Sequence, residues 1–335
     1  MRRQPVVAAA ALAALLALFG GAVYRFYQGE PPAGREAVRV TVPPGASFRE
    51  IGEILRREGI LEETRWLSLV GRIGGAHRRV QAGVYRIVPG TPGGRVLRLL
   101  QRGSNEVIRV TIPEGLRLEE VARILFSELA IREEEVLRIA TDSAFARSLG
   151  APGPTLEGYL FPDTYFFFPT EQAEQVLGRM VEAFRDRFST AEKARAAELG
   201  LLPREAVTLA SIVESEAVLP EEQPRIAAVY HNRLRIGWRL QADPTVQYAL
   251  GTREPPLLAD LEVESPYNTY RNPGLPPGPI CSPGESSIRA ALYPTEGSED
   301  LFFVAAGEGG RHVFSRTAEE HGRATRRARS LRDSP

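Results

Sequence analysis

The sequence predicts an α+β protein in which an N-terminal transmembrane helix precedes a small α+β module and then a larger, mixed α+β domain. Three observations support this prediction. The chain begins with a long apolar segment without charges, a strand, turn and helix pattern then occurs twice, and helical stretches alternate with loop-rich ones over the rest of the chain. Neither an all-helical nor an all-strand protein would show this mixture of periodicities.

Length and composition are those of a folded protein. The chain has 335 residues, of which 43% are hydrophobic and 25% charged, so it can bury a core and form about two domains. It carries 42 basic and 42 acidic residues, and this balance provides no field that would attract nucleic acid. Cys281 is the only cysteine, which excludes an intramolecular disulfide.

The apolar segment at residues 4–24 contains no charge and is rich in Ala, Leu and Val. As a helix it would be about 30 Å long, which is enough to cross a bilayer. A cleaved secretory signal is the alternative, with Gly20-Gly21-Ala22 as a weak cleavage site. We predict a cytoplasmic tip and transmembrane anchor over residues 1–28 and a linker over residues 29–35. Both interpretations place the rest of the chain outside the cytoplasm.

The repeated pattern defines the small module. Residues 38–42 alternate apolar and polar side chains before a Pro-Pro-Gly turn, and helical spacing follows at Ile51, Ile54 and Leu55. The same pattern recurs at residues 108–115 and 121–125. A further strand at residues 82–87 and helix around residues 96–100 lie between the copies. We therefore predict a small α+β module over residues 36–112 and a larger domain over residues 113–335.

The larger domain combines helices with an unusually long loop-rich stretch. Residues 239–284 are rich in Pro, Gly, Asn and Tyr, which is typical of a functional surface built from loops. The other elements that we predict are helical structure over 116–149, a packed strand or ordered loop over 156–168, helices over 172–188 and 203–217, a strand over 301–305, and a solvated helix or tail after 321.

The helix at residues 203–217 carries two glutamates near its end, Glu214 and Glu216, in a part that is apolar on nearly all sides. A carboxyl group in apolar surroundings has a raised pKa, as the general acid of a glycosidase requires. At 100° per residue the two side chains point about 200° apart, so only one of them can serve a given cleft. The alternative is that both pair with arginines, such as Arg225 or Arg233, and fix helix packing.

Loop residues supply candidate partners for a sugar, whose ring faces stack on aromatic side chains and whose hydroxyls need donors and acceptors. They occur in three groups: Glu157, Tyr159, Asp163, Thr164 and Tyr165; Gln241, Asp243 and Thr245; and Tyr267, Asn268, Thr269 and Tyr270. The alternative is that Asp243 and Asn268 cap turns while the tyrosines pack.

Other chemistries lack support. The chain has no Gly-rich phosphate loop after a strand and no paired His or Cys at metal-ligand spacing, so we expect neither a cofactor nor a metal. His312 and His321 are isolated in the sequence, which favours core or surface roles. Cys281 has no base nearby in the sequence and is a poor candidate nucleophile.

Several motifs together resemble those of one family, the YceG-like endolytic murein transglycosylases. They are Leu156-Glu157-Gly158-Tyr159-Leu160-Phe161-Pro162-Asp163-Thr164-Tyr165, Ala210-Ser211-Ile212-Val213-Glu214-Ser215-Glu216, Asn232-Arg233-Leu234, Leu240-Gln241-Ala242-Asp243-Pro244-Thr245-Val246, Tyr267-Asn268-Thr269-Tyr270 and Gly274-Leu275-Pro276-Pro277-Gly278. The resemblance covers nearly the whole chain in the same order. It implies a LysM-like module over residues 36–112 and a catalytic transglycosylase domain over residues 113–335.

The resemblance also implies an activity. The reaction would be endolytic cleavage of the β-1,4 bond between N-acetylmuramic acid and N-acetylglucosamine, leaving a 1,6-anhydromuramyl end, with Glu214, the first glutamate of the motif, as acid and base. Arg233 and the loop residues named above would bind the glycan. Ser215 and Ala242 depart from the residues common at these positions, and Ala242 puts one substrate hydrogen bond in doubt.

The implied partners are peptidoglycan strands, the bacterial plasma membrane and peptidoglycan synthases, with a role in ending strand growth. A lysozyme-like hydrolase and a non-catalytic wall-binding scaffold are the alternative functions.

Overall fold

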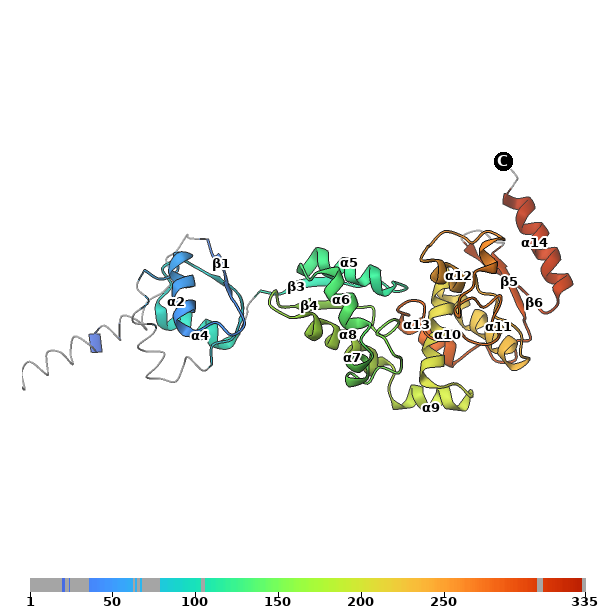
Figure 1. Cartoon of the computed structure of the whole chain (residues 1–335), viewed down its shortest axis with the longest axis horizontal. Helices are drawn as coiled ribbons and strands as arrows, with labels where there is room; N and C mark the ends of the chain where they lie inside the picture. The colour runs from blue at the N-terminus through green and yellow to red at the C-terminus, as the bar shows by residue number, and fades with distance from the viewer. Residues whose placement is uncertain are drawn as a thin grey trace, which may run out of the picture. The chain divides into compact units, whose positions relative to one another are not determined.

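The structure is a computed structural model that describes residues 36–62, 64, 67, 79–103, 106–305 and 310–332, with Gly20, Gly21 and Tyr24 besides. These residues form a mixed α+β protein, as the sequence predicts, and the structure adds that their strands pair into three two-stranded sheets (Figure 1). The predicted anchor and linker lie outside the described residues, except for those three positions. Within the described part of the chain, no helix has the length and apolar character needed to cross a membrane.

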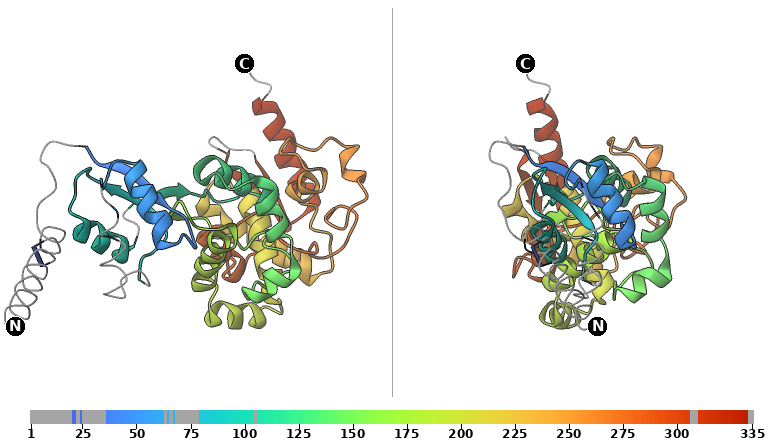
Figure 2. Two further views of the ribbon diagram at one scale, coloured as in Figure 1. Left: turned by 60° about the vertical axis from the view of Figure 1, so that its left-hand side comes forward. Right: turned by 90° about the vertical axis from the view of Figure 1, so that its left-hand side faces the viewer.

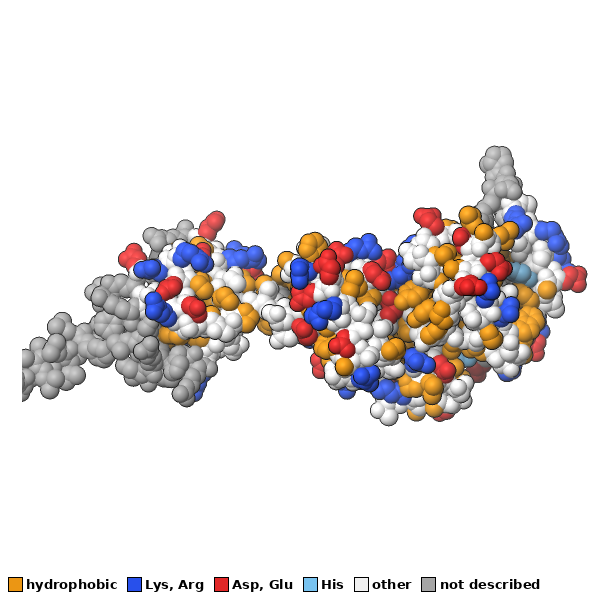
Figure 3. All heavy atoms as spheres, viewed as in Figure 1, with side chains coloured by type: hydrophobic (Ala, Val, Ile, Leu, Met, Phe, Trp, Pro, Cys, Tyr) orange, Lys and Arg blue, Asp and Glu red, His pale blue; other side chains and the backbone are white. Residues whose placement is uncertain are grey.

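The chain divides into two compact units. Unit 1 comprises residues up to Arg109 together with Phe166–Glu171, and unit 2 comprises Val110–Tyr165 and Gln172–Pro335. On the face seen in Figure 3, basic and acidic side chains are interspersed on the described residues, as the equal numbers of the two charges lead one to expect.

Unit 1 contains the first copy of the repeated pattern and the strand and helix predicted between the two copies. Strand β1 (Val38–Val42) pairs antiparallel with β2 (Gly83–Ile87), and the helices are α2 (Phe48–Arg57) and α4 (Gly93–Arg102). Ser47 begins α2 with a capping box in which Glu50 bonds back to the Ser47 N–H. The core joins alternate residues of the strands to one face of each helix, for example Val40, Tyr85, Leu55 and Leu100.

The two-stranded sheet of β3 (Ile108–Thr111) and β4 (Thr164–Phe167) begins the larger part of the chain. In unit 2 the Ile112 N–H donates to the Asp163 carbonyl at 2.9 Å, and the hydroxyls of Thr111 and Thr164 lie 3.0 Å apart. Val110 and Ile112 are buried. Residues 156–163 are an ordered loop that leads into β4, which confirms the predicted packed segment.

Unit 2 is mainly helical. Its elements are α5 (Leu118–Leu129), α6 (Glu133–Ala140), α7 (Ser143–Ser148), α8 (Ala173–Arg187), α9 (Thr190–Glu198), α10 (Pro203–Glu216), η2 (Pro220–Glu222), α11 (Gln223–Arg235), α12 (Asp243–Leu250), η3 (Asp260–Glu262), α13 (Glu285–Leu292), β5 (Phe302–Ala305), β6 (His312–Ser315) and α14 (Ala318–Arg332). Helix α10 packs against α9, α11, α12 and α13, and in Figure 2 it lies inside the unit. Residues 206–213 of α10 are all buried, which confirms the predicted buried helix.

Candidate active site

The two glutamates at the end of α10 contact different elements. The Oε2 atom of Glu214 accepts the Gly284 N–H at 3.0 Å and the Ser287 hydroxyl at 2.6 Å, and both donors belong to the start of α13. A negative charge at a helix N-terminus is favoured by the helix dipole. Glu214 therefore caps α13 from another helix.

Glu114, in the turn after β3, lies in the same cluster as Glu214. A Cβ atom on Gly284 would lie 2.1 Å from Cδ of Glu114, so the Glu114 carboxyl occupies the space beside this glycine. Burial raises the pKa of Glu114, and the negative charges of Glu214 and Glu285 raise it further. The surroundings of Glu214 are therefore polar, whereas the periodicity of α10 predicted apolar ones. The difference arises because α13 and the turn after β3 supply contacts that one helix cannot reveal.

Glu216 has different surroundings. Its Oε1 atom accepts the hydroxyl hydrogen of Tyr230, on α11, at 2.7 Å. Burial raises the pKa of Glu216 to about 7, the hydrogen bond from Tyr230 opposes this rise, and the charge of Asp243 adds to it. The protonated carboxylic acid is therefore well populated near neutral pH.

A pocket of about 470 Å³ opens beside Glu216. Its lining residues are Glu216, Tyr230, Arg233, Gln241, Asp243, Tyr270, Phe302, Phe303, Val304, Ala305, His312 and His321. The structure thus brings four sequence-predicted candidates, Arg233, Gln241, Asp243 and Tyr270, together with the second glutamate of the motif. Glu214 is not among the residues that line this pocket.

The polar side chains of this pocket are held in place. The Tyr270 hydroxyl donates to Oδ1 of Asp243 at 2.6 Å. The buried Arg233 side chain stacks on Phe302 and donates to two backbone carbonyls, those of Leu301 at 2.7 Å and of Leu240. The alternative interpretation of the sequence was that Arg225 or Arg233 pairs with Glu214 and Glu216. In the structure, Arg233 donates to backbone carbonyls instead, and Arg225 pairs with Asp300.

Gln241 has a left-handed backbone, with φ of +51°, which is uncommon for a residue other than glycine. Its N–H donates to the Thr269 carbonyl at 3.2 Å. Conformations of this kind persist where the surrounding structure enforces them, and they are concentrated at functional sites.

Sequence reasoning missed the aromatic wall of the pocket. Phe302 stacks with His321 at 5.1 Å between ring centroids, and Phe303 packs edge-on against Tyr230 at 5.8 Å. His312 Nδ1 lies 2.8 Å from Glu222. These histidines looked isolated because their partners Phe302, Phe303 and Glu222 come from β5 and η2, and no local spacing in the sequence signals such contacts.

Three further predicted residues are buried and do not line the pocket: Thr245, Asn268 and Thr269. The hydroxyls of Thr245 and Thr269 lie 2.9 Å apart, and Thr269 Oγ1 also accepts the Ala242 N–H at 3.0 Å. The Asn268 side-chain amide donates to two carbonyls of its own loop, each at 2.9 Å. These are the capping and packing roles of the alternative interpretation, and they position the segments that carry Asp243 and Tyr270.

The remaining predicted residues lie elsewhere in unit 2. Glu157 is buried, accepts the Leu118 N–H and the Tyr248 hydroxyl at 3.3 Å each, and has its pKa raised by burial to about 7. The others are Tyr159, packed edge-on against Phe184; Asp163, which accepts the Thr164 N–H; Thr164, beside Thr111; Tyr165, which donates to the Phe161 carbonyl; and Tyr267, packed against Tyr248. None of these six lines the Glu216 pocket. Their contact with a saccharide stays a prediction.

The pocket has the chemistry that a glycan site requires. It offers a carboxylic acid that can be neutral at pH 7, a second carboxyl group, an amide, a guanidinium group and several aromatic faces. No group of three or more His, Cys, Asp or Glu side chains that could hold a metal ion occurs among the described residues. The arrangement can protonate a leaving oxygen and stabilise positive charge nearby.

Comparisons with known proteins agree on one family. The model of the YceG-like family matches residues 40–327. An endolytic murein transglycosylase of Bacillus subtilis is 32% identical over 307 residues, which cover 87% of this chain and 84% of the relative. One of Streptococcus pneumoniae is 28% identical over 322 residues, and the match covers 86% of this chain but 58% of that relative.

A solved structure has the same fold. The crystal structure of a YceG-like protein from Listeria monocytogenes superposes with a TM-score of 0.60 at 33% identity, and the match covers 87% of this chain and 99% of that chain.

Proposed function

The chain belongs to the YceG-like family, and from this premise we propose that it is a lytic transglycosylase that cleaves the glycan strands of peptidoglycan. The observation that carries the proposal is the half-buried, protonatable carboxyl of Glu216 in a pocket lined by aromatic and hydrogen-bonding side chains. The names of the relatives point to the same chemistry.

The proposed reaction breaks the β-1,4 bond between N-acetylmuramic acid and N-acetylglucosamine within a strand. Glu216 gives its proton to the leaving glycosidic oxygen, and the 6-hydroxyl of the muramic acid attacks its own anomeric carbon. The Glu216 carboxylate then takes the hydroxyl proton, so the acid is restored and a 1,6-anhydro end results. Because the nucleophile is part of the substrate, no second carboxyl is needed to attack or to activate water.

The geometry favours Glu216 over Glu214 as this acid and base. The acid must be protonated near neutral pH and must face the sugar, and Glu216 meets both conditions through its raised pKa and its place in the pocket wall. Glu214, which the family resemblance implied, bonds to the start of α13 instead. We assign Glu214 the structural role of fixing that helix.

The other pocket residues have matching roles in the proposal. Asp243, held by Tyr270, would stabilise the positive charge that develops at the anomeric carbon. Phe302 offers a ring face for a sugar, while Gln241 offers an amide for its hydroxyl or acetamido groups.

Paired variants test the assignment. Glu216→Gln should lower the rate of cleavage of purified sacculi by about 10²–10⁴-fold, the usual contribution of a general acid. Glu214→Gln is the matched control, since it makes the same change two residues away. It should keep most of the activity and lose about 1 kcal/mol of stability, as for a lost helix cap. Inactivity of the Glu214 variant alone would return the catalytic role to Glu214.

Product analysis separates this function from the alternatives. Mass spectrometry should detect anhydro ends, and products heavier by one water would instead identify a lysozyme-like hydrolase. Binding to sacculi with no release of muropeptides by the intact protein would identify a wall-binding scaffold.

The proposal extends to the place of action. Residues 4–24 would anchor the chain once in the bacterial plasma membrane, residues 36–112 would form a LysM-like module, and residues 113–335 would act outside the cytoplasm. There the enzyme would end nascent strands beside peptidoglycan synthases. Crosslinking in cells checks the last point, and a lack of any synthase among the captured proteins would refute it.

A further inference from the structure

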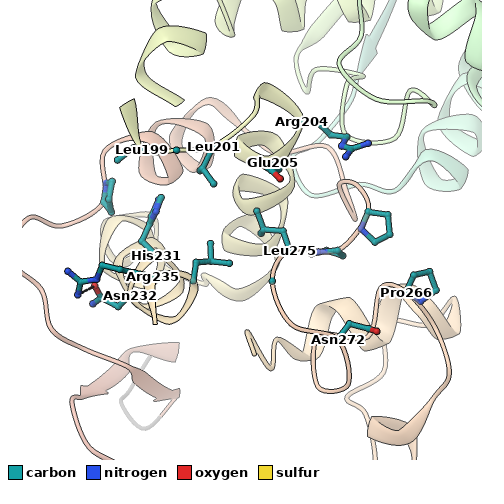
Figure 4. A pocket seen from close by; sticks show the side chains of 16 residues that line it. Leu199, Leu201, Arg204, Glu205, His231, Asn232, Arg235, Pro266, Asn272 and Leu275 are labelled. Atoms are coloured by element: carbon teal, nitrogen blue, oxygen red, sulfur yellow. Dashed lines mark hydrogen bonds between the residues drawn. The ribbon is translucent and has the colours of Figure 1, made fainter. Parts of the chain in front are cut away.

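A second pocket of unit 2, of about 820 Å³, has no role in the proposed reaction. It is walled by the segment from α9 to the start of α10, by α11 and by a proline-rich loop at residues 266–277 (Figure 4). Tyr230 and Arg233 of α11 line the Glu216 pocket, whereas His231, Leu234 and Arg235 line this one. Helix α11 is thus a wall of both pockets.

The second pocket carries net positive charge. Arg204 and Arg235 line it, and neither forms an ion pair with a described carboxylate. The Glu205 carboxylate accepts the Leu202 N–H at 2.8 Å, at the start of α10. Burial lowers the pKa of His231, so its imidazole is neutral near pH 7. The two guanidinium groups outweigh the single carboxylate.

The middle of the pocket is apolar. Figure 4 shows Leu201 and Leu275 between Arg204 and the side chains of α11. Leu199, Leu234 and four prolines are further apolar residues of the lining, to which Asn232 and Asn272 also belong. An occupant should therefore have small apolar groups in its middle and carboxylates toward its ends, because arginine binds carboxylates with paired hydrogen bonds. A bare glycan of hydroxyl and acetamido groups does not have this pattern.

We propose that this pocket binds the peptide stem of the glycan strand, with stem carboxylates at Arg204 and Arg235 and stem methyl groups against the leucines and prolines. The proposal rests on the proposed function and adds a substrate feature to it. It makes the enzyme selective for strands that still carry their stems.

The dimensions agree with one substrate molecule reaching both pockets. Arg204 and Glu216 are separated by twelve residues of α10, a rise of roughly 18 Å. An extended peptide of about five residues spans roughly 17 Å. The length of an extended stem is therefore similar to the separation of Glu216 and Arg204 along α10.

The test compares two substrates made from one preparation, strands with stems and the same strands after an amidase has removed them. The wild-type full-length protein should cleave stem-bearing strands with a KM about tenfold lower. The double variant Arg204→Ala/Arg235→Ala should lose this difference and keep its kcat on bare strands. Arg289→Ala, which changes an exposed arginine on α13 outside the pocket, is the matched control and should behave as wild type.

A binding measurement separates the two proposals. Calorimetry with the free stem peptide should give binding to Glu216→Gln protein that the two arginine substitutions abolish, with unchanged thermal unfolding to show an intact fold. Equal KM values for the two substrates, or no peptide binding, would refute the stem site while the glycan cleavage stands. Peptide binding without any cleavage by the wild type would instead refute the proposed function alone.

Discussion

At the scale of single residues, Asp243 and Glu216 form a carboxyl pair whose charges interact. The Tyr270 hydroxyl holds Asp243, and the negative charge of Asp243 adds to the burial that raises the pKa of Glu216 to about 7. A general acid works only while protonated, so activity should fall as pH rises through this pKa. Asp243 therefore extends the working range of Glu216 toward higher pH.

We predict that Asp243→Asn moves the alkaline limb of the kcat/KM profile to lower pH. The substitution keeps the shape and removes the charge, so the pKa of Glu216 falls and less acid is protonated at pH 8. The loss of activity should be larger at pH 8 than at pH 5. A loss that is the same at every pH would mean that Asp243 serves only to bind substrate or hold the loop.

The sequence alone could not choose between Glu214 and Glu216, the two glutamates at the end of α10. Periodicity showed that both lie in a buried helix and point apart, and both conclusions hold in the structure. The partners that distinguish them, Tyr230 and Ser287, come from α11 and α13. Only tertiary structure reveals that one carboxyl caps a helix while the other lines a pocket.

At the scale of elements, segments with strong periodicity were predicted well. The helices predicted at residues 172–188 and 203–217 are α8 (Ala173–Arg187) and α10 (Pro203–Glu216). Helix α11, the shorter helices α9, α12 and α13, and strand β6 were not predicted. In α9 the only buried residue is Ala196, so no apolar face marks it. The start of α12 lies in a stretch rich in Pro and Gly, which hid an eight-residue helix.

The loop at residues 156–163 and the segment at residues 279–284 pack closely at Gly158. This glycine has φ of +80°, and a Cβ there would lie 2.3 Å from Cβ of Pro279 and 3.2 Å from the Cys281 carbonyl oxygen. Both the left-handed backbone and the close approach therefore require glycine. The segment beyond Pro279 leads to Gly284, which Glu214 holds.

We predict that Gly158→Ala lowers the free energy of unfolding by about 2–4 kcal/mol, since backbone strain and overpacking act together. Urea unfolding of the purified protein measures the change. Gly200→Ala is a suitable control, because Gly200 also has a positive φ but has no atom within 4 Å of the added Cβ. Equal losses in the two variants would show that backbone strain alone, and not the packing against Pro279, explains the effect.

At the scale of the whole molecule, the sequence predicted an α+β chain with an early boundary near residue 112. The structure divides the chain into two units and assigns Phe166–Glu171 to unit 1, although these residues follow the first helices of unit 2. The order of elements along the sequence cannot show that this later segment belongs to the earlier unit, because its assignment depends on the pairing of β3 with β4.

Two truncations test two separate features, the predicted membrane anchor and strand β3. Removal of residues 1–28 should release the protein from the membrane fraction and leave its cleavage of purified sacculi unchanged, because the deletion ends before β1 (Val38–Val42) and leaves all the later helices and strands in place. Recovery of the shortened chain with the membranes would contradict the predicted anchor.

A chain that begins at residue 113 should instead fold poorly, since it lacks Val110, the Thr111 hydroxyl beside Thr164 and the Ile112 N–H bonded to the Asp163 carbonyl.

The control for that second truncation is a chain that begins at residue 106 and keeps β3. Loss of the two buried side chains Val110 and Ile112 should cost roughly 3–6 kcal/mol, at about 1.5–3 kcal/mol for each fully buried aliphatic group. That is a large share of the stability of a typical domain. We therefore expect the longer chain to unfold cooperatively in thermal melts and the shorter one to lose cooperativity or aggregate. Equal melting temperatures would show that β3 contributes little to unit 2.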